Sequence, residues 1–429
     1  MSIGRTDANL HTSSRPTILV LGTRGIPAAH GGFETFAERI ALFLAGRGWK
    51  VIVYCQHEVS VVTRRIITDD WNGIERRHVN VVSTGPRATL EFDWHCVRDA
   101  ATEAGVCLVL GYNSGVFLTY LRIKGCKIIT NMDGIEWQRS KWGSGARAWL
   151  WANERIAAFT SHRLVADHPE IANHIATRRR RDVIATIPYG GNEIRSASEI
   201  PIRTLGLQPD NYLISIARIE PENNILTIIQ AFCRQRRDAK LVVLGRLDDT
   251  VPYHREVHAA AGDEVVFPGA IYDKDTVASL RYHARAYLHG HTVGGTNPSL
   301  VEALWAGNAV IAHDNRFNRW TAGDAGLFFS ALDDCEHHIT RIFSDTECLD
   351  YCRRAARRQA TTRFNWDDVL RAYEREALDL LAGVADQPKD QPITELTRRH
   401  TAAVASALAP RTSWAISPVL TPASPNRQE

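Results

Sequence analysis

The stretch HGHTVGGTNPSLVEALWAGNAVIAHD, residues 289–314, joins a glycine-rich loop to an apolar helical pattern. Asn297 or Thr296 suits the cap position before a helix, and Pro298 suits the first helical turn. A helix that begins here points its free amide N–H groups back at the loop, where they can bind an anion. The stretch therefore predicts a phosphate seat at the start of a helix, with one acid, Glu302, about a turn inside it.

The rest of the chain alternates short apolar segments with longer helical patterns. Strands are expected at residues 17–22, 50–54, 79–83, 106–111, 126–130 and 163–166, and again at 212–217, 240–245, 265–267, 286–288, 309–313 and 326–329. Several of these segments are apolar throughout, which is typical of parallel strands covered on both faces. The turn-rich segment IPYGGNEI, residues 187–194, interrupts the alternation. The sequence therefore predicts two α/β units, each built on a doubly wound parallel sheet.

These patterns also predict the limits of the segments. Residues 1–15 and 386–429 are expected to be disordered tails, because they are polar or rich in Pro, Ser, Thr and Ala. Residues 16–195 and 196–365 are expected to form the two α/β domains. Residues 366–385 carry an amphipathic helix pattern, which we expect to cross back and brace the first domain.

Composition and charge limit the functions that the chain can have. Its 429 residues are 44% hydrophobic and 23% charged, as in soluble globular proteins, and a net charge of +3 is too small to indicate nucleic acid as a partner. No apolar segment approaches the ~18 residues of a membrane span, and the N-terminus lacks the apolar region of a signal peptide. The eight cysteines form no C-x-x-C pair, so thiols in a reducing cytoplasm are favoured over a metal site.

Ligands of open α/β sheets bind at the carboxyl ends of the strands, so the loops after the expected strands are the candidate sites. LGTRGIPAAHGGFET, residues 21–35, follows a strand and opens a helix, and it contains Arg24, His30, Gly31 and Gly32. Its spacing is not the G-x-G-x-x-G of a dinucleotide turn. We favour a ligand-binding loop over a purely structural strand-to-helix crossover.

The loop NMDGIEWQRSKW, residues 131–142, directly follows an expected strand and mixes charges with aromatic rings. Asp133 comes at the carboxyl end of the strand, and Glu136 and Trp137 follow it. Mixed loops at this position are typical of sites that handle sugars and acids. The alternative is a loop whose charges pair with one another and whose tryptophans pack, and we favour the functional interpretation.

Three further motifs have a structural and a functional interpretation. In ARIEPENN, residues 217–224, Arg218 is suited to clamp a phosphate or to pair with a glutamate of the same loop. Asp273 and Asp275 form a D-x-D, the metal motif of a different class of sugar transferase, but they precede a helical pattern, so a helix cap is favoured. The arginines of TRRRRD, residues 177–182, are interpreted as a solvated helix face, with a contact to anionic lipid headgroups as the alternative.

Several motifs together carry a resemblance to a known family. They are the G-x-x-G-I-P and GGFE loop after the first strand, the IPYGGNE junction, the ARIEPENN loop and GGTNPSLVEALWAGNAVIA. In this combination the chain resembles a retaining GT-B glycosyltransferase of family 4. More narrowly, it resembles the bacterial rhamnosyltransferase-like branch, which is involved in cell-surface polysaccharide synthesis. The resemblance covers about residues 16–383 and implies two Rossmann-like domains that face each other across a cleft.

The resemblance also implies a role for each loop. A nucleoside-diphosphate sugar would bind mainly to the second domain, with its base near Gly269 and Ile271 and its ribose on Glu302. The other donor contacts would come from the glycine loop and the ARIEPENN loop, namely Arg218, Asn223, Gly294, Gly295, Thr296, Asn297, Pro298 and Ser299. The acceptor would lie on the first domain, against Arg24, His30, Gly31, Gly32, Glu136 and Trp137. The expected catalytic residues are Asp133, which would orient the sugar or the acceptor, with Arg218 and Glu302.

The chain departs from the family pattern at two positions. Most members place two glutamates eight residues apart around the glycine loop; Glu302 matches the second, and Gly294 stands in place of the first. Most members also have a lysine five residues after the arginine that Arg218 matches, and here that residue is Asn223. The sequence GGTNPS fits the rhamnosyltransferase-like branch, and so does PENN, residues 221–224. We therefore expect the helix N-terminus and Arg24 to compensate for the lost charge, and weaker activity is the alternative. A 6-deoxy sugar, which has one hydroxyl fewer, would suit the lost acid.

The resemblance implies transfer of a sugar, with rhamnose as the best guess, to a hydroxyl of a growing, lipid-linked cell-surface glycan. The expected donor is deoxythymidine-diphosphate rhamnose (dTDP-rhamnose), and neither a metal nor another cofactor is expected. The enzyme would work in the cytoplasm, at the inner face of the plasma membrane, as a peripheral membrane protein and without nucleic acid.

Two other classes of function stay open. A nicotinamide-dependent oxidoreductase or a sugar-nucleotide epimerase would need the G-x-G-x-x-G turn and an acid after the second strand, where the chain has Tyr54, Cys55 and Gln56. A catalytically silent scaffold homologue is suggested by the two departures from the family pattern. The retained Arg218 and Glu302 argue against it.

Overall fold

The computed structural model describes residues 15–28, 31–139 and 141–383. All of them belong to one compact unit of the chain, Met1–Ala385. The predicted tails, except for Arg15, and the candidate residue His30 lie outside the described residues. No helix within the described ranges is long and apolar enough to cross a membrane.

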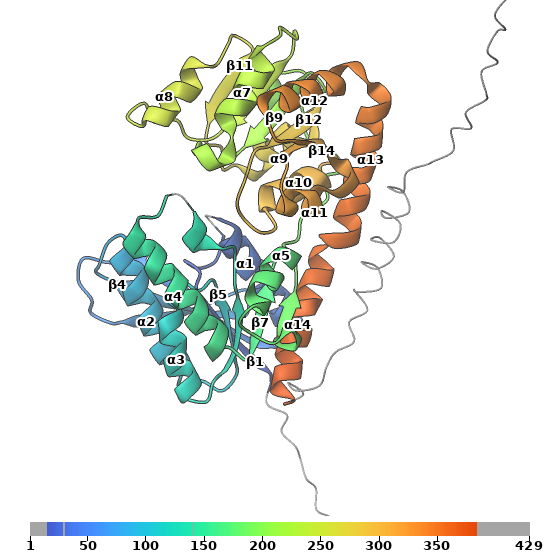
Figure 1. The fold of residues 1–429 in the computed structure, drawn as a ribbon. Coiled ribbons are helices and arrows are strands. Elements are labelled where there is room, and N and C mark those ends of the chain that lie inside the picture. Colours follow the sequence, from blue (N-terminus) through green and yellow to red (C-terminus); the bar gives the residue numbers. More distant parts are fainter. Residues whose placement is uncertain (1–14, 29–30, 140, 384–429) are drawn as a thin grey trace, which may run out of the picture. The chain divides into compact units, whose positions relative to one another are not determined.

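The first half of the chain forms an eight-stranded sheet in the order β3-β4-β2-β1-β5-β6-β7-β8 (Figure 1). Its strands are β1 Thr17–Leu21, β2 Lys50–Glu58, β3 Ile66–Trp71, β4 Ile74–Val81, β5 Val106–Leu110, β6 Lys127–Asn131, β7 Arg163–Ala166 and β8 Ile184–Thr186. The connecting helices are α1 Gly31–Gly46, α2 Pro86–Ala100, α3 Gly115–Ile123, η1 Glu136–Gln138, α4 Ser144–Thr160, α5 Pro169–Ala176 and η2 Arg181–Val183. We call these elements the first half.

The second half contains a six-stranded, wholly parallel sheet in the order β11-β10-β9-β12-β13-β14. Its strands are β9 Tyr212–Ile216, β10 Lys240–Leu244, β11 Val265–Gly269, β12 Ala286–His289, β13 Ala309–His313 and β14 Gly326–Phe329. Its helices are α6 Ile200–Thr204, η3 Pro221–Asn223, α7 Ile225–Cys233, α8 Pro252–Ala259, α9 Lys274–Tyr282, α10 Pro298–Trp305, α11 Arg316–Ala322, η4 Gly323–Ala325, α12 Leu332–Ser344 and α13 Thr346–Arg363.

Strand β3 departs from the expected wholly parallel first sheet, because it pairs antiparallel with β4 at the edge of the sheet. The two strands form a hairpin whose turn, Asn72 and Gly73, has φ angles of 53° and 78°. Asn-Gly is the dipeptide most typical of tight hairpin turns, because both residues tolerate positive φ. The prediction of parallel strands is therefore wrong at this edge, although the local signal for a hairpin was present.

Strand β1 shows why the central strands are apolar throughout. Leu19 and Leu21 pack into the core on one face of the sheet, and Ile18 and Val20 pack into the core on the other face. Burial of an aliphatic side chain of this size contributes about 1.5–3 kcal/mol. Strand β9 divides its side chains between two cores in the same way. This arrangement confirms the prediction of two doubly wound sheets.

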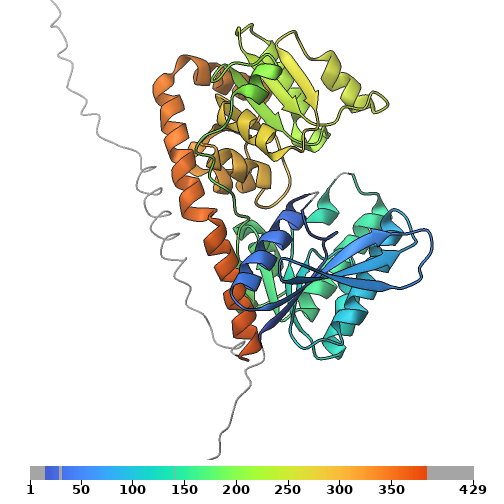
Figure 2. The same cartoon turned by 180° about the vertical axis from the view of Figure 1, so that it is seen from behind.

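Helix α14, Trp366–Leu381, packs on the first half although it follows the second half in sequence. Its apolar residues join the core that contains Ile18 and Val20; they are Trp366, Val369, Leu370, Tyr373, Ala377 and Leu380. Asn131, at the end of β6, donates a hydrogen bond of 2.7 Å to the hydroxyl of Tyr373. Figures 1 and 2 show α13 and α14 in succession, α13 beside the second half and α14 beside the first.

The strand order reverses at one point in each sheet. In the first sheet β1 lies between β2 and β5. Strands β2, β3 and β4 are added on one side of β1, and strands β5 to β8 are added on the other side. The second sheet reverses in the same way between β9 and β12. Loops at the carboxyl ends of such strand pairs diverge and leave room for a ligand. We call these places the first switch point (β1 and β5) and the second switch point (β9 and β12).

Candidate functional site

At the second switch point, the loop after β12 ends in a capped helix. The side-chain oxygen of Asn297 accepts a hydrogen bond of 2.9 Å from the amide of Ser299, so Asn297, one of the two predicted candidates, caps α10. Gly294 has a φ of 143°, which a residue with a side chain adopts only under strain. The backbone of this loop is therefore built for glycine at the position where most members of the resembled family carry a glutamate.

Glu302 lies on α10 and is held by a neighbouring helix. Arg281 of α9 forms an ion pair of 2.6 Å with its carboxylate, which remains 38% exposed. The same guanidinium donates a hydrogen bond of 3.1 Å to Ser299, whose hydroxyl lies 2.8 Å from that of Tyr287. Glu302 is thus fixed in position and still has oxygen atoms free to accept hydroxyl donors.

The loop after β9 supplies Arg218 and Asn223. Arg218 is 58% exposed and pairs with Glu220 at 3.2 Å, which is the structural alternative considered for it. Asn223 is buried, and its side-chain amide donates a hydrogen bond of 2.8 Å to the carbonyl of Arg218. A Cβ at Gly290 would overlap the carbonyl of Asn223, so the loops after β9 and β12 are in close contact. Asn223 therefore braces the Arg218 loop.

Two histidines stack on each other just before the glycine loop. The rings of His289 and His291 stack with centroids 4.2 Å apart and planes 10° apart. Burial lowers the pKa of both, and the nearby Arg139 and Arg218 help to lower that of His291 to about 3. Both rings are therefore neutral at physiological pH and add no positive charge.

Asp133 and Asp167 lie next to each other in the loops that follow β6 and β7 of the first sheet. Strands β6 and β7 pair Asn131 with Val165. Asp133 and Asp167 each come two residues later, so they lie at the same level beyond the edge of the sheet. Asp133 has a φ of 50°, a left-handed conformation that aspartate tolerates and that is often found at functional sites. Burial and Glu136 raise the pKa of Asp133 to about 6. Burial and Asp133 raise the pKa of Asp167 to about 8.

Asp167 meets the glycine loop of the second half. Its Oδ2 accepts a hydrogen bond of 3.0 Å from the amide of Thr296, and its carbonyl accepts one from the Thr296 hydroxyl. A Cβ at Gly295 would overlap its Oδ1, which has no hydrogen-bond partner among the described residues. The carboxyl group of Asp167 thus occupies part of the predicted anion-binding site. Asp167 was not among the predicted site residues, although it directly follows an expected strand just as the Asp133 loop does.

Helix α1 begins opposite α10. A Cβ at Gly32 would lie 3.3 Å from Cγ of Pro298, so the first turns of the two helices are in contact. Glu34, in the first turn of α1, accepts a hydrogen bond of 3.2 Å from the amide of Arg24. The structure therefore brings the N-termini of two helices, and the Gly31-Gly32 loop, to one place.

Ion pairs and a hydrogen bond hold the loop after β6 in place. Glu136 pairs with Arg139 at 2.6 Å and with Lys141 at 3.8 Å, and Trp137 donates a hydrogen bond of 2.6 Å to Glu154. These contacts match the structural alternative for this loop. Arg139 also reaches Glu222 of the loop after β9 at 3.3 Å.

Two predicted donor contacts lie apart from the glycine loop. Gly269 ends β11, the edge strand that two further strands separate from β12. Ile271 follows it and packs against the core of the second half. Close by, Asp273 caps α9 by accepting a hydrogen bond of 2.8 Å from the amide of Thr276, which confirms the helix-cap interpretation. No group of three or more metal-binding side chains was found in the part of the chain that the structure describes.

The arginine run at residues 177–182 is engaged within the first half. Each arginine has a partner: Arg178 with Glu154, Arg179 with the carbonyl of Ser161, Arg180 with Asp182, and Arg181 with Thr186. Arg178 and Arg179 are also partly buried. The run is therefore only in part a solvated face.

Two family models match the chain in sequence. Residues 200–359 match the model Glycosyl transferases group 1, and residues 15–192 match a domain of unknown function, DUF1972. The second half is therefore a glycosyltransferase group 1 domain. No curated protein matches the chain significantly in sequence.

Solved structures resemble the chain over both halves. Sucrose-phosphate synthase (tll1590) from Thermosynechococcus elongatus has a TM-score of 0.71 at 18% identity, and the match covers 86% of this chain and 100% of that one. HepE (Alr3699) from Anabaena, in complex with UDP and glucose, has a TM-score of 0.64 at 15% identity, and the match covers 84% of this chain and 99% of that one. An α,α-trehalose-phosphate synthase (UDP-forming) from Burkholderia xenovorans, in complex with glucose-6-phosphate, has a TM-score of 0.65 at 12% identity. That match covers 85% of this chain and 100% of the other. At these identities the similarity shows the fold, which is GT-B as predicted.

Proposed function

We propose that the chain is a retaining glycosyltransferase of family 4, in the rhamnosyltransferase-like branch, that uses a nucleoside-diphosphate sugar. The observation that carries this proposal is the contact between two helix N-termini, where Gly32 of α1 approaches Pro298 of α10. The positive ends of both helix dipoles point toward one place and favour an anion there. The diphosphate of a sugar nucleotide is the anion that suits a glycosyltransferase group 1 domain.

The second half supplies the other donor contacts in this proposal. Arg218 is more than half exposed and can turn from Glu220 to a phosphate, which a guanidinium binds with two hydrogen bonds. Glu302 accepts hydrogen bonds from the ribose hydroxyls with the oxygen atoms that its ion pair leaves exposed. The base lies toward Gly269 and Ile271.

In the proposed reaction, the bond between the anomeric carbon and the diphosphate oxygen breaks, and a bond to the acceptor oxygen forms on the same face. The acceptor proton passes to the departing diphosphate, so no protein nucleophile is required. Arg218, the amide of Gly295 and the dipole of α10 stabilise the charge that grows on the diphosphate. Asp133 orients the sugar or the acceptor hydroxyl, and neither a metal nor another cofactor takes part.

We assign the transferred sugar to the 6-deoxy class, and dTDP-rhamnose is the first donor to test. The φ of 143° at Gly294 is unsuited to any residue with a side chain. The sugar therefore has one carboxylate partner fewer than in most members of the resembled family. A sugar that lacks one hydroxyl needs one hydrogen-bond partner fewer.

We place the acceptor, a lipid-linked glycan, at the inner face of the plasma membrane. An exposed stripe on α4 supports this placement: Arg147, Trp151, Arg155 and Phe159 follow one another at four-residue intervals. Trp151 and Phe159 are 46% and 60% exposed, and the guanidinium of Arg155 lies 3.5 Å from the ring centre of Trp151. Aromatic rings beside cations are typical of helices that lie on anionic lipid headgroups. The α4 stripe is therefore a better membrane contact than the engaged arginine run.

The proposal is tested by calorimetric and thermal-stability measurements of the full chain with UDP, dTDP, UDP-glucose and dTDP-rhamnose. A ligand at a hundredfold excess over its dissociation constant stabilises the folded chain by about 2.7 kcal/mol. We expect Glu302→Ala to lose this stabilisation, because the ribose loses its acceptor. Glu347→Ala removes an exposed glutamate from α13 in the same half, and it should retain the stabilisation.

Two results would contradict the proposal in different ways. If no nucleotide or sugar nucleotide stabilises the wild-type chain, the second switch point does not bind a donor. If donors bind but no nucleoside diphosphate is released with any acceptor, the chain is a binding protein or scaffold and not a transferase.

A further inference from the structure

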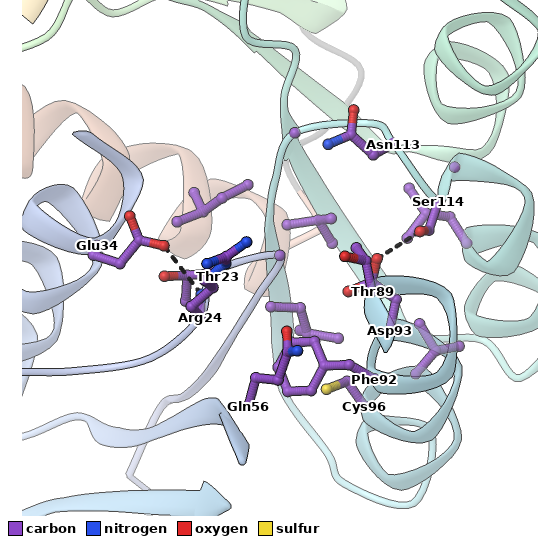
Figure 3. A pocket seen from close by; sticks show the side chains of 18 residues that line it. Thr23, Arg24, Glu34, Gln56, Thr89, Phe92, Asp93, Cys96, Asn113 and Ser114 are labelled. Carbon is purple, nitrogen blue, oxygen red and sulfur yellow. Dashed lines mark hydrogen bonds between the residues drawn. The ribbon is translucent and has the colours of Figure 1, made fainter. Parts of the chain in front are cut away.

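A cavity lies at the first switch point, between the carboxyl ends of β1 and β5 (Figure 3). Its volume is about 230 Å³. A single water needs only ~10–15 Å³ on this measure, so the cavity admits a small molecule. Its walls come from the loop after β1, the first turn of α1, helix α2 and the loop after β5. Of the described residues given a role in the proposed transfer, Arg24 alone lines it.

The cavity combines apolar and hydrogen-bonding surface. Leu21, Phe92 and Leu118 are among the apolar residues that line it, and Gln56 and Asn113 carry amides that both donate and accept hydrogen bonds. A sugar ring has apolar C–H faces and hydroxyl groups around its edge. The surface is therefore suited to one sugar residue.

Asp93, on α2, is the acid on one wall of this cavity. Its Oδ2 accepts a hydrogen bond of 2.5 Å from the hydroxyl of Ser114, and Figure 3 shows the two side chains pointing toward each other. Burial raises the pKa of Asp93 to about 6, and among the described residues no cation pairs with it. At neutral pH it is thus a carboxylate with one hydroxyl donor and with lone pairs left for further donors.

The charges around the cavity disfavour an anion. Glu34 lies on the wall opposite Asp93, next to Arg24 (Figure 3). Arg24 is the only basic side chain among the described residues that line the cavity. Two carboxylates and one guanidinium leave a net negative charge, which repels a phosphate at short range. Hydroxyl groups carry no charge and can donate to both carboxylates.

On the basis of the proposed glycosyltransferase function, we infer that the first switch point binds the acceptor through one neutral, unphosphorylated sugar residue, whose hydroxyls are held by Asp93. Asp93 then determines acceptor specificity without taking part in the transfer step. A sugar phosphate is excluded as the acceptor by the two carboxylates.

The structural alternative is a cavity filled with water. Ser114 occupies the position before α3 and its hydroxyl bonds Asp93, so Asp93 would then serve only to hold Ser114 in place. This alternative predicts that changes at Asp93 alter stability but not the binding of any sugar.

The test is saturation-transfer NMR on the full chain, with methyl glycosides of glucose, galactose, mannose and rhamnose and with glucose 6-phosphate as probes. We expect at least one glycoside to bind and glucose 6-phosphate not to bind at the same concentration. Asp93→Asn keeps the side-chain shape and removes the charge, so it should weaken the glycoside about tenfold and admit glucose 6-phosphate. Thr89→Phe, in the part of α2 that lines the cavity, should fill it and abolish glycoside binding.

Glu91→Gln is the matched control. Glu91 lies on the same helix, outside the cavity lining, and pairs with Arg65 at 2.6 Å. The control should leave glycoside binding unchanged.

Several results would overturn the inference. It is wrong if glucose 6-phosphate binds the wild-type chain as tightly as the glycosides, or if Asp93→Asn leaves glycoside binding unchanged. It is also wrong if no probe binds, because the cavity is then a water-filled part of the core. These measurements need no donor turnover. Failure of the transferase proposal would be seen separately, as the absence of nucleotide binding at the second switch point.

Discussion

The second switch point presents backbone amides, a helix N-terminus and a half-exposed arginine, whereas the first switch point encloses a cavity lined by two acids and one arginine. The two places have the same topology, since each lies where the strand order of a parallel sheet reverses. We propose opposite ligands for them, a diphosphate at the second switch point and neutral hydroxyl groups at the first. The comparison teaches that topology locates a ligand site and that the loop residues select the ligand.

Removal of the cation at the second switch point should have the largest effect. We expect Arg218→Ala to slow release of the nucleoside diphosphate by about 10²–10³-fold, because the leaving group loses a fixed charge partner. Donor turnover measures this effect. Arg203→Ala removes an exposed arginine of α6 and serves as the control. Glycoside binding at the first switch point should not change, and an equal loss at both places would contradict their separate roles.

The junction between the two halves should be the next most sensitive place. A Cβ at Gly191 would overlap the ring of Trp305 at the end of α10, so Gly191→Ala should destabilise the chain by about 1–3 kcal/mol. Urea unfolding measures this loss. Gly46→Ala, where a Cβ would meet no atom within 4 Å, should be neutral or slightly stabilising. Equal stability of the two variants would show that the junction is not tightly packed.

The pKa of Asp167 sharpens the comparison, because this acid of the first half lies against the glycine loop of the second. Its pKa is raised to about 8, so protonation favours the folded state. This stabilisation is complete below the unfolded pKa of about 3.9 and is lost as the pH rises through about 8. Asp167→Asn mimics the protonated form, so its advantage in stability over the wild type should grow from pH 5 to pH 8 by about 1 kcal/mol or more.

Thermal unfolding of both proteins at the two pH values measures this difference. Glu347→Gln, at an exposed position of α13, should show no such dependence. A constant difference between Asp167→Asn and the wild type would mean that Asp167 is already ionised at the lower pH.

The smallest effect is expected at the α4 stripe, which belongs to the first half alone. Trp151→Ala and Phe159→Ala should each weaken binding to vesicles of anionic phospholipid a few-fold, because each removes apolar area from the membrane contact. Vesicle co-sedimentation measures the binding. Tyr272→Ala removes an 82% exposed aromatic side chain from the second half and should have no effect. If the stripe variants bind vesicles as the wild type does, α4 is not the membrane contact.

Local interactions explain what the sequence analysis predicted well. Asn297 and Asp273 cap helices through hydrogen bonds to residues two or three positions away, so both caps could be recognised from the sequence. The apolar segments of the central strands carry the same kind of local signal. The Asn72-Gly73 turn was just as local, but no strand was predicted at residues 66–71, so the hairpin was missed.

The amino-acid sequence by itself determined the two doubly wound sheets and the loops in which a ligand site can lie, because strand patterns and helix caps depend on neighbouring residues. Only the tertiary structure decided which side chains meet there. Asp167 bonds Thr296 from 129 residues away, and Asp93 and Ser114 meet across 21 residues from different elements. Such contacts depend on strand order and on the packing of the two halves. No local pattern of residues encodes them.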